Sequence, residues 1–340
     1  MGFSDYLVRR LIYTIFIIIG ITILIFVLTR VLPGDPVRLA LGPEASGEQI
    51  EQTRRIWGLD QPLYIQYLRF VVGFFTLDWG VSTRTLQPVI EDIAKYGPAS
   101  YELSILSLII AVAIGLPLGI VSAINKDKWQ DHFGRITSLT GVAMPIFWTG
   151  LMLQLLLASY LGLFPIGMRL SPWMDPPTHI TGFFTLDSLL TGNWPAFWDA
   201  SYHLILPALV LSFPGIANIS RLMRSTMIDQ RSKEYITLQT TYGMPRRIIT
   251  YKYMLKNSFA ATLTMIALMF AYSLGGIVLI ERVFIWPGLG TYLVDGIWYK
   301  DFNAIMSVVV MVGIIIVLAN LIADLIYGYL DPRIRYGADK

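Results

Sequence analysis

Cysteine is absent from this 340-residue sequence, and histidine occurs only three times. The lack of cysteine excludes disulfides, thiolate metal sites and cysteine nucleophiles. His132, His179 and His203 lie in separate segments without paired metal-ligand spacing, and no helical H-E-x-x-H motif occurs. The G-x-x-x-x-G-K-[ST] phosphate loop is missing as well. We therefore expect no metal site, no cofactor and no ATP hydrolysis by this chain, and a membrane-embedded protease or transferase has little support.

Charged residues are also scarce. They make up 14% of the chain, compared with about 25% in soluble domains. Apolar residues account for 55%, and the mean hydropathy is +0.59. This composition indicates an integral membrane protein embedded in the lipid bilayer. The net charge of +3 is small and gives no indication of nucleic-acid binding.

Long apolar runs predict an all-α membrane protein with six transmembrane helices. The first run extends from Leu11 to Thr29 and reaches about 28 Å, enough for a hydrocarbon core of about 30 Å. No small-x-small cleavage pattern follows it, so we interpret residues 1–32 as an uncleaved anchor helix. The five further runs cover residues 101–124, 136–160, 204–223, 259–280 and 305–330.

The distribution of lysine and arginine predicts the orientation of these spans. With the amino terminus inside, the inner segments hold sixteen basic residues and the outer segments ten. Seven of those ten lie in one long outer segment, where charge has less influence on topology. The shorter outer loops contain only Arg169, Arg282 and Lys300. We therefore expect a multi-pass protein of the cell membrane with both termini in the cytoplasm.

Two long segments are predicted to lie outside the membrane. Residues 33–100 form an extracytoplasmic segment in which Ser46 and Gln49 match a capping box, so an amphipathic helix is expected from Gly47 to Trp57. The aromatic run from Tyr64 to Trp79 is predicted to lie along the membrane interface. The second long outer loop covers residues 161–203. Either these segments receive a substrate-binding protein or they only cap the helices.

The longest polar interruption on the predicted inner side is EYITLQTTYGMPRRI, residues 234–248. Nothing breaks a helix before Tyr242, and Gly243 followed by Pro245 provides a helix stop. A glycine in the turn lets another protein approach the backbone closely. Arg246 and Arg247 give the segment just after the turn a positive charge. The stretch suits docking against a second protein, and a solvated loop between two spans fits the residues as well.

This stretch resembles the cytoplasmic loop of inner-membrane permease subunits of ABC importers, in the dipeptide and oligopeptide branch. Peptide permeases often carry an acidic residue, tyrosine and a hydrophobic residue nine positions before the glycine, as Glu234, Tyr235 and Ile236 do here. Thr237, Leu238 and Gln239 replace the Glu-Ala-Ala of the general family pattern. The resemblance implies a coupling helix that docks on an ATPase, with the contact residues Glu234, Tyr235, Thr237, Gly243, Met244, Pro245, Arg246 and Arg247.

Several prolines and polar residues inside the spans suggest a transport path or gate. The fourth run is interrupted by Pro207, Pro214 and Gly215, and broken helices mark transport paths. Met144 and Pro145, followed by Trp148, make a similar case in the third run. The segment around Trp286 resembles the external gate of the permease family. The candidate path and gate residues are Pro145, Trp148, Gln154, Pro214, Asn218, Trp286, Pro287 and Gly288. Asp324 in the sixth run is expected to have a structural partner, with Asn320 one turn away.

The resemblance extends over nearly the whole chain, from LPGDP at residue 32 through WPGLG to LDPRIR at residue 330. It implies a type I ABC importer permease whose transmembrane core covers residues 101–335, with the coupling loop at residues 224–256. The implied partners are a second related permease, one or two cytoplasmic ABC ATPases and an extracytoplasmic substrate-binding protein. Dipeptides or oligopeptides are the expected substrates, with oligosaccharides or nickel as alternatives in the same branch. An ion-coupled secondary transporter is an alternative of another class, although Asp324 alone gives it little support.

Overall fold

The computed structural model describes residues 3–31, 36–42 and 44–330. Within these ranges every element is helical, apart from one isolated bridge between Val81 and Pro88. The helices are α1 (Phe3–Val31), α2 (Pro36–Leu41), α3 (Gly47–Ile56), α4 (Leu63–Phe75), α5 (Val89–Ile124), α6 (Trp129–Ala143), α7 (Ile146–Leu153), the π-helix η1 (Gln154–Tyr160), α8 (Phe184–Thr191), α9 (Trp194–Arg231), α10 (Glu234–Thr241), α11 (Arg246–Ile248), the π-helix η2 (Ile249–Met254), α12 (Leu255–Val283), α13 (Leu289–Tyr299) and α14 (Phe302–Leu330). The predicted all-helical class is confirmed.

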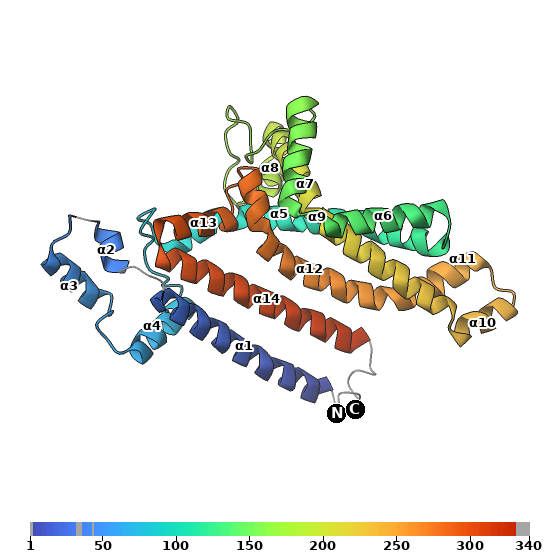
Figure 1. Ribbon diagram of the computed structural model, residues 1–340, viewed down its shortest axis with the longest axis horizontal. Helices are drawn as coiled ribbons and strands as arrows, with labels where there is room; N and C mark the ends of the chain where they lie inside the picture. Colours follow the sequence, from blue (N-terminus) through green and yellow to red (C-terminus); the bar gives the residue numbers. More distant parts are fainter. Residues whose placement is uncertain (1–2, 32–35, 43, 331–340) are drawn as a thin grey trace.

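The long helices form a bundle that extends along the long axis of the molecule (Figure 1). Five helices in the described part are long and apolar enough to cross a membrane, and a bent pair of helices makes a sixth candidate. The beginning of α1 and the end of α14 lie at the same end of the bundle, and α10 extends toward that end as well. The gate segment between α12 and α13 lies toward the opposite end.

Helices α5 and α9 pack closely because small residues line their contact. A Cβ atom on Gly119 would lie 2.6 Å from the carbonyl oxygen of Ser220, and a Cβ atom on Gly215 would lie 2.7 Å from the Cβ atom of Ala111. Small side chains let membrane helices approach until their backbones are in van der Waals contact. Because a larger side chain would push the two helices apart, the glycines fix the distance between α5 and α9.

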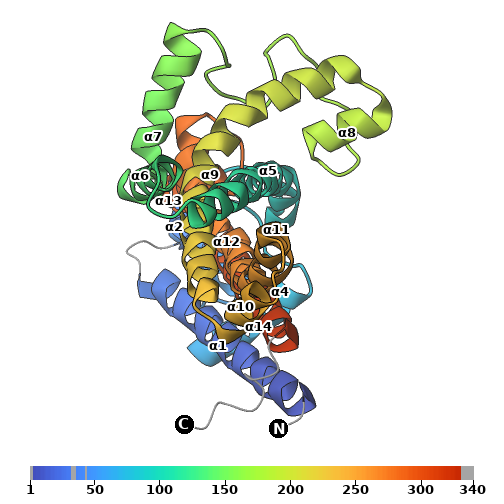
Figure 2. The same cartoon turned by 90° about the vertical axis from the view of Figure 1, so that its right-hand side faces the viewer.

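The third predicted span bends by 106° between α6 and α7, at the proline that the sequence indicated as a possible break. Pro145 has no backbone N–H group, and its ring disfavours a helical conformation at the preceding Met144. Met144 accordingly has an extended backbone, with ψ at 129°. The helix α7 leaves the bundle, and in Figure 2 α7 and α8 both lie at the end of the molecule opposite α1.

The fourth span was expected to be broken, and that expectation is wrong. Pro207 and Pro214 both lie inside the continuous helix α9, which has 38 residues. Its side chains pack against α5, α6, α8 and α12, and most of its apolar window is buried. Neighbouring helices can hold a proline-containing helix together because they compensate for the missing hydrogen bonds. Of the two spans for which the sequence suggested a break, the third is bent at Pro145 and the fourth is continuous.

The amphipathic helix in the segment 33–100 is confirmed as α3, including its capping box. The Ser46 hydroxyl accepts from the Gln49 amide, and the Gln49 side chain accepts from the Ser46 amide. Helix α4 lies against α1, where the rings of Tyr67 and Phe26 meet edge to face at 5.5 Å. The LPGDP motif and the DPRIR motif, which the sequence analysis singled out, lie almost entirely outside the described residues.

Candidate functional site

The predicted coupling helix is α10, and its end has the expected turn. Gly243 adopts a positive φ of 72°, which glycine tolerates at little cost. The Gly243 amide donates to the carbonyl of Thr240, and the Met244 amide donates to the carbonyl of Gln239. These two bonds form a Schellman motif, which satisfies carbonyl groups that the helix end leaves free. We use the name coupling element for residues 234–247.

One side of the coupling element is anchored to the bundle. Ile236 is buried in an apolar cluster with Met223 and Met227 of α9. The hydroxyl of Tyr235 donates to Gln230 at the end of α9, and it accepts from Asn257 at the start of α12. Tyr235 therefore braces the coupling element from inside, whereas the sequence analysis placed it among the residues that contact a partner. The anchored side ties α10 to both long helices that flank it.

The other side of the coupling element is open. Leu238 is 55% exposed and Tyr242 is 77% exposed, although both are large apolar or aromatic side chains. A Cβ atom on Gly243 would meet no atom within 4 Å. The remaining predicted contact residues on this surface are also exposed: Glu234, Thr237, Met244, Pro245, Arg246 and Arg247. This surface combines exposed apolar side chains with two arginines, a composition that suits a protein interface.

A buried ion pair supports the same end of the bundle. Both oxygens of the Asp131 carboxylate accept from the Arg224 guanidinium, at 2.5 and 2.8 Å, and Asp131 is fully buried. The hydroxyl of Ser122 and the amide of Asp127 also donate to this carboxylate. The pair joins the first turn of α6 to helix α9, seven residues before α9 ends. Since the loss of one partner would leave a buried charge, the pair holds these helices in one arrangement.

The predicted gate segment is a tight turn at the opposite end of the bundle, which we call the gate turn (residues 284–290). Trp286 is 1% exposed, and its indole N–H donates to the carbonyl of Ala99 on α5. The Glu281 carboxylate is fully buried and accepts from the hydroxyl of Ser100 and the amide of Thr291. The Leu289 amide donates to the same Ser100 hydroxyl. The gate turn is thus fixed to α5 through Trp286 and through Glu281.

Gly288 is needed in the gate turn because of space rather than backbone conformation. Its φ of −115° is accessible to any residue, but a Cβ atom would lie 2.1 Å from a carboxylate oxygen of Glu281. A Cβ atom on Gly290 would lie 2.7 Å from the Cα atom of Val278. Any side chain at either position would displace the carboxylate or the backbone of α12.

The remaining predicted path residues are not gathered in one site. Gln154 donates to the carbonyls of Ile166 and Val283, so it connects the π-helix η1 to α12. Trp148 is 43% exposed on α7, and Pro145 forms the bend before it. Pro214 and Asn218 lie within α9. The described residues therefore place the gate turn at one end, and the predicted path residues on three separate helices.

A cavity of about 800 Å³ lies next to the gate turn, between the first turns of α5 and the loop 168–184. Arg169 in this loop is buried and forms an ion pair with Glu102 at 2.6 Å. Burial lowers the pKa of the Arg169 guanidinium, and Glu102 opposes this shift. Burial would raise the pKa of the Asp187 carboxyl, but hydrogen bonds from Thr181 and from the amides of residues 180 and 182 outweigh it and keep that pKa below its ordinary value. These pairs fold the loop into a fixed wall.

The sequence analysis missed three buried polar residues of structural importance, Ser100, Asp131 and Glu281, and the half-buried Arg224 that pairs with Asp131. A signal existed for Glu281, because it follows the apolar run GGIVLI and a carboxylate there needs buried partners. Asp324 does have a structural partner, as expected, but that partner is Arg10 of α1 at 2.7 Å. The proposed partnership with Asn320 is replaced by this contact between two helices far apart in the sequence.

Comparison with known proteins identifies the family. The model described as "Binding-protein-dependent transport system inner membrane component" matches residues 115–336. A second model, for the N-terminal part of such membrane components, matches residues 3–88. The chain belongs to this family. It is therefore a multi-pass component of the inner membrane, and the expected class of transport permease is confirmed.

Curated relatives are similar to this transport component over their full length. It is 42% identical over 340 residues to the probable D,D-dipeptide transport system permease protein DdpB of Escherichia coli, with all of both chains covered. It is 38% identical to the dipeptide transport system permease protein DppB of Alkalihalophilus pseudofirmus, with 97% of this chain and 99% of the relative covered. It is 36% identical to the oligopeptide transport system permease protein AppB of Bacillus subtilis, with 98% and 100% covered.

Proposed function

We propose that this chain is a membrane-spanning permease subunit of an ATP-driven importer and forms half of the translocation path for dipeptides or oligopeptides. The observation that carries the substrate class is the full-length similarity to three permeases whose names specify D,D-dipeptide, dipeptide and oligopeptide transport. Those names give no support to the oligosaccharide and nickel alternatives. The substrate site itself would form between this chain and a second permease.

The proposed partners are a second related permease, one or two cytoplasmic ABC ATPases and an extracytoplasmic substrate-binding protein. The family description, a binding-protein-dependent transport system, supports these partners as a class. The exposed side of the coupling element supports an ATPase contact, because Leu238 and Tyr242 present apolar surface beside Arg246. In this arrangement both termini and α10 lie in the cytoplasm, as the excess of basic residues on that side favours.

The coupling element and the gate turn give the proposed subunit two ends with different roles. Closure of the ATPases would displace α10, which is anchored to α9 and α12 by Ile236 and Tyr235. The gate turn at the other end is attached to α5 and α12 through Ser100 and Glu281. Because α5, α9 and α12 pack against one another, a displacement of α10 would also shift the helices that hold the gate turn.

Uptake into vesicles tests the proposal. The chain is reconstituted with its second permease and ATPases, and the binding protein is loaded with a labelled dipeptide. We expect ATP-dependent accumulation that an excess of unlabelled dipeptide or oligopeptide suppresses, and that an oligosaccharide or nickel leaves unchanged. Uptake that persists without ATP and stops when the ion gradient is collapsed would instead establish the secondary transporter.

A further inference from the structure

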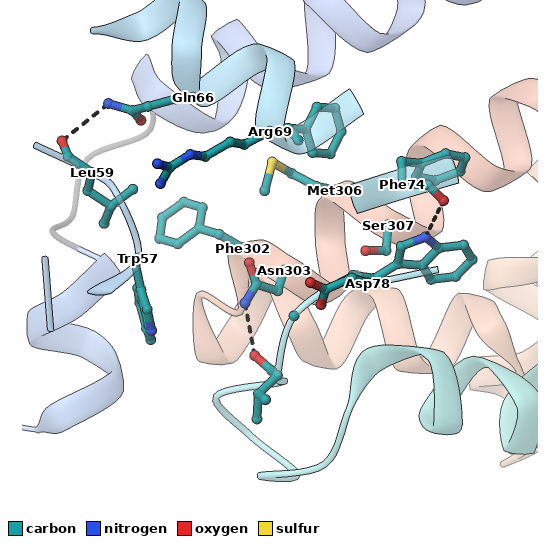
Figure 3. Close-up of a pocket in the computed structure, with 14 residues that line it drawn as sticks. Trp57, Leu59, Gln66, Arg69, Phe74, Asp78, Phe302, Asn303, Met306 and Ser307 are labelled. Carbon is teal, nitrogen blue, oxygen red and sulfur yellow. Dashed lines mark hydrogen bonds between the residues drawn. The ribbon is translucent and has the colours of Figure 1, made fainter. Parts of the chain in front are cut away.

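A second cavity, of about 410 Å³, lies away from the coupling element and the gate turn (Figure 3). The loop after α3, the helix α4 with the turn that follows it, and the first two turns of α14 form its walls. The proposed transport path makes no use of this cavity. We refer to it as the α4–α14 cavity.

The walls of the α4–α14 cavity are held in place by hydrogen bonds. The side chain of Gln66 on α4 donates to the carbonyl of Leu59 at 3.2 Å, which fixes the loop after α3. The side chain of Asn303 on α14 donates to the carbonyl of Val81 at 2.9 Å, which fixes the segment after α4. A Cβ atom on Gly80 would lie 2.8 Å from the Asn303 amide nitrogen, so only glycine permits this contact. The cavity therefore exists before any ligand binds.

Aromatic rings form much of the lining. The rings of Phe74 and Trp79 stack with centroids 5.1 Å apart, and the Trp79 indole donates to the Phe74 carbonyl. Trp57 and Phe302 line the same space. Aromatic faces bind cations as well as apolar groups, because the ring face is electron-rich.

Two exposed residues of opposite charge, Arg69 and Asp78, line the α4–α14 cavity. Within the described part of the chain, no hydrogen bond or ion pair involves the side chain of Arg69 or that of Asp78. In Figure 3 the two charged groups lie apart, with Phe302 between them. A Cβ atom on Gly58 would lie 2.1 Å from an Arg69 guanidinium nitrogen, so the sequence leaves room for the guanidinium at this wall. An accessible guanidinium and an accessible carboxylate at the wall of one preformed cavity complement a zwitterion.

The position of the cavity relative to the membrane indicates which kind of zwitterion would fit it. Phe302 is the first residue of α14 and of its candidate membrane span. Met306, which lines the cavity, accepts a hydrogen bond from Thr29, the last residue of the first candidate span. The cavity thus lies at the boundary of the membrane, where lipid headgroups lie. On α4, the residue before Arg69 begins an exposed apolar stripe that suits acyl chains: Leu68, Val72 and Phe75 are 58, 60 and 67% exposed.

We propose that the α4–α14 cavity binds the headgroup of a phospholipid that carries a phosphate and a primary ammonium. The Arg69 guanidinium would bind the phosphate, since its planar fork matches phosphate oxygens. The Asp78 carboxylate would accept hydrogen bonds from the ammonium, which a trimethylated ammonium does not offer. A free dipeptide has the same two charges, but it has no acyl chains to cover the apolar stripe on α4. The site is independent of the substrate proposed above.

Lipid retention tests this proposal. The complex of the full chain with its partners is placed in nanodiscs with equal amounts of phosphatidylethanolamine, phosphatidylcholine and phosphatidylglycerol, then extracted with detergent. Mass spectrometry counts the lipids that remain bound. We expect phosphatidylethanolamine to be enriched, and Arg69→Ala to lower its retention about tenfold. Asp78→Asn should abolish the preference over the other two lipids without removing phosphate-dependent binding.

A matched control is Arg55→Ala, because Arg55 is an exposed arginine on α3 that lies outside the cavity. This variant should retain the lipids as the unmodified protein does. Equal retention of the three lipids by the unmodified complex would overturn the proposal, as would unchanged retention in Arg69→Ala. Displacement of the lipid by millimolar glycylglycine would also overturn it, in favour of a peptide site.

Discussion

Gly243 offers the sharpest test of the coupling element, because the structure separates two effects of a substitution there. Its φ of 72° means that any other residue strains the turn, by about 1 to 2 kcal/mol. A Cβ atom would meet nothing within 4 Å, so Gly243→Trp creates no clash inside the chain. If an ATPase packs against this turn, overpacking adds about 1 to 3 kcal/mol at the interface. That range lowers the association constant from about fivefold to more than a hundredfold.

The assay is co-purification of the ATPase with the tagged chain, followed by substrate-stimulated ATP hydrolysis. Gly192 provides the matched control, since it has a φ of 70° and equally open surroundings but follows α8, outside the coupling element. Gly192→Trp should retain the ATPase, and Gly243→Ala should lose much less of it than Gly243→Trp. Wild-type ATPase retention and transport in Gly243→Trp would refute the docking role and leave a solvated loop.

Three further predictions follow from the two ends of the bundle. A reporter fused after Ser232 should be cytoplasmic and one fused after Pro172 external, and the reverse result for either would contradict the proposed orientation. The purified chain alone should hydrolyse no ATP, whereas the assembled complex should, and should do so faster with loaded binding protein; hydrolysis by the contaminant-free chain would contradict the permease role. Gly288→Ala should reduce transport at least tenfold while membrane insertion stays normal, because its Cβ atom would displace the Glu281 carboxylate; unchanged uptake would show that the gate turn tolerates this shift.

Much of the architecture could be predicted from the sequence, because long apolar runs and capping signals act locally. The capping box at Ser46 and the helix stop at Gly243 were both confirmed, since each depends on residues within one turn. Prolines indicated a possible break in both the third and the fourth span, but the sequence did not show which of the two would bend. Pro145 bends the third span, whereas Pro214 is accommodated in α9 by the helices around it. The deciding factor is packing by distant segments, which no local pattern contains.

The candidate site was predictable on its exposed side and not on its buried side. The exposure of residues such as Arg246 and Tyr242 could be predicted from the polar stretch that contains them. The partner of Asp324 is more than 300 positions away in the sequence, and Glu281 is satisfied by Ser100 from another helix. Such pairs depend on which helices become neighbours, so they emerge only from the folded structure.

The glycine-lined contact between α5 and α9 determines how this molecule can move. The two helices are packed with their backbones in contact and have no free volume in which to slide, so they move together as one rigid body. In this rigid body, α9 is separated from α10 by only two residues. Helix α5 carries Ser100, which is hydrogen-bonded to the gate turn. A tilt of α5 and α9 together would move both ends of the bundle at once, without successive rearrangements of side chains between them.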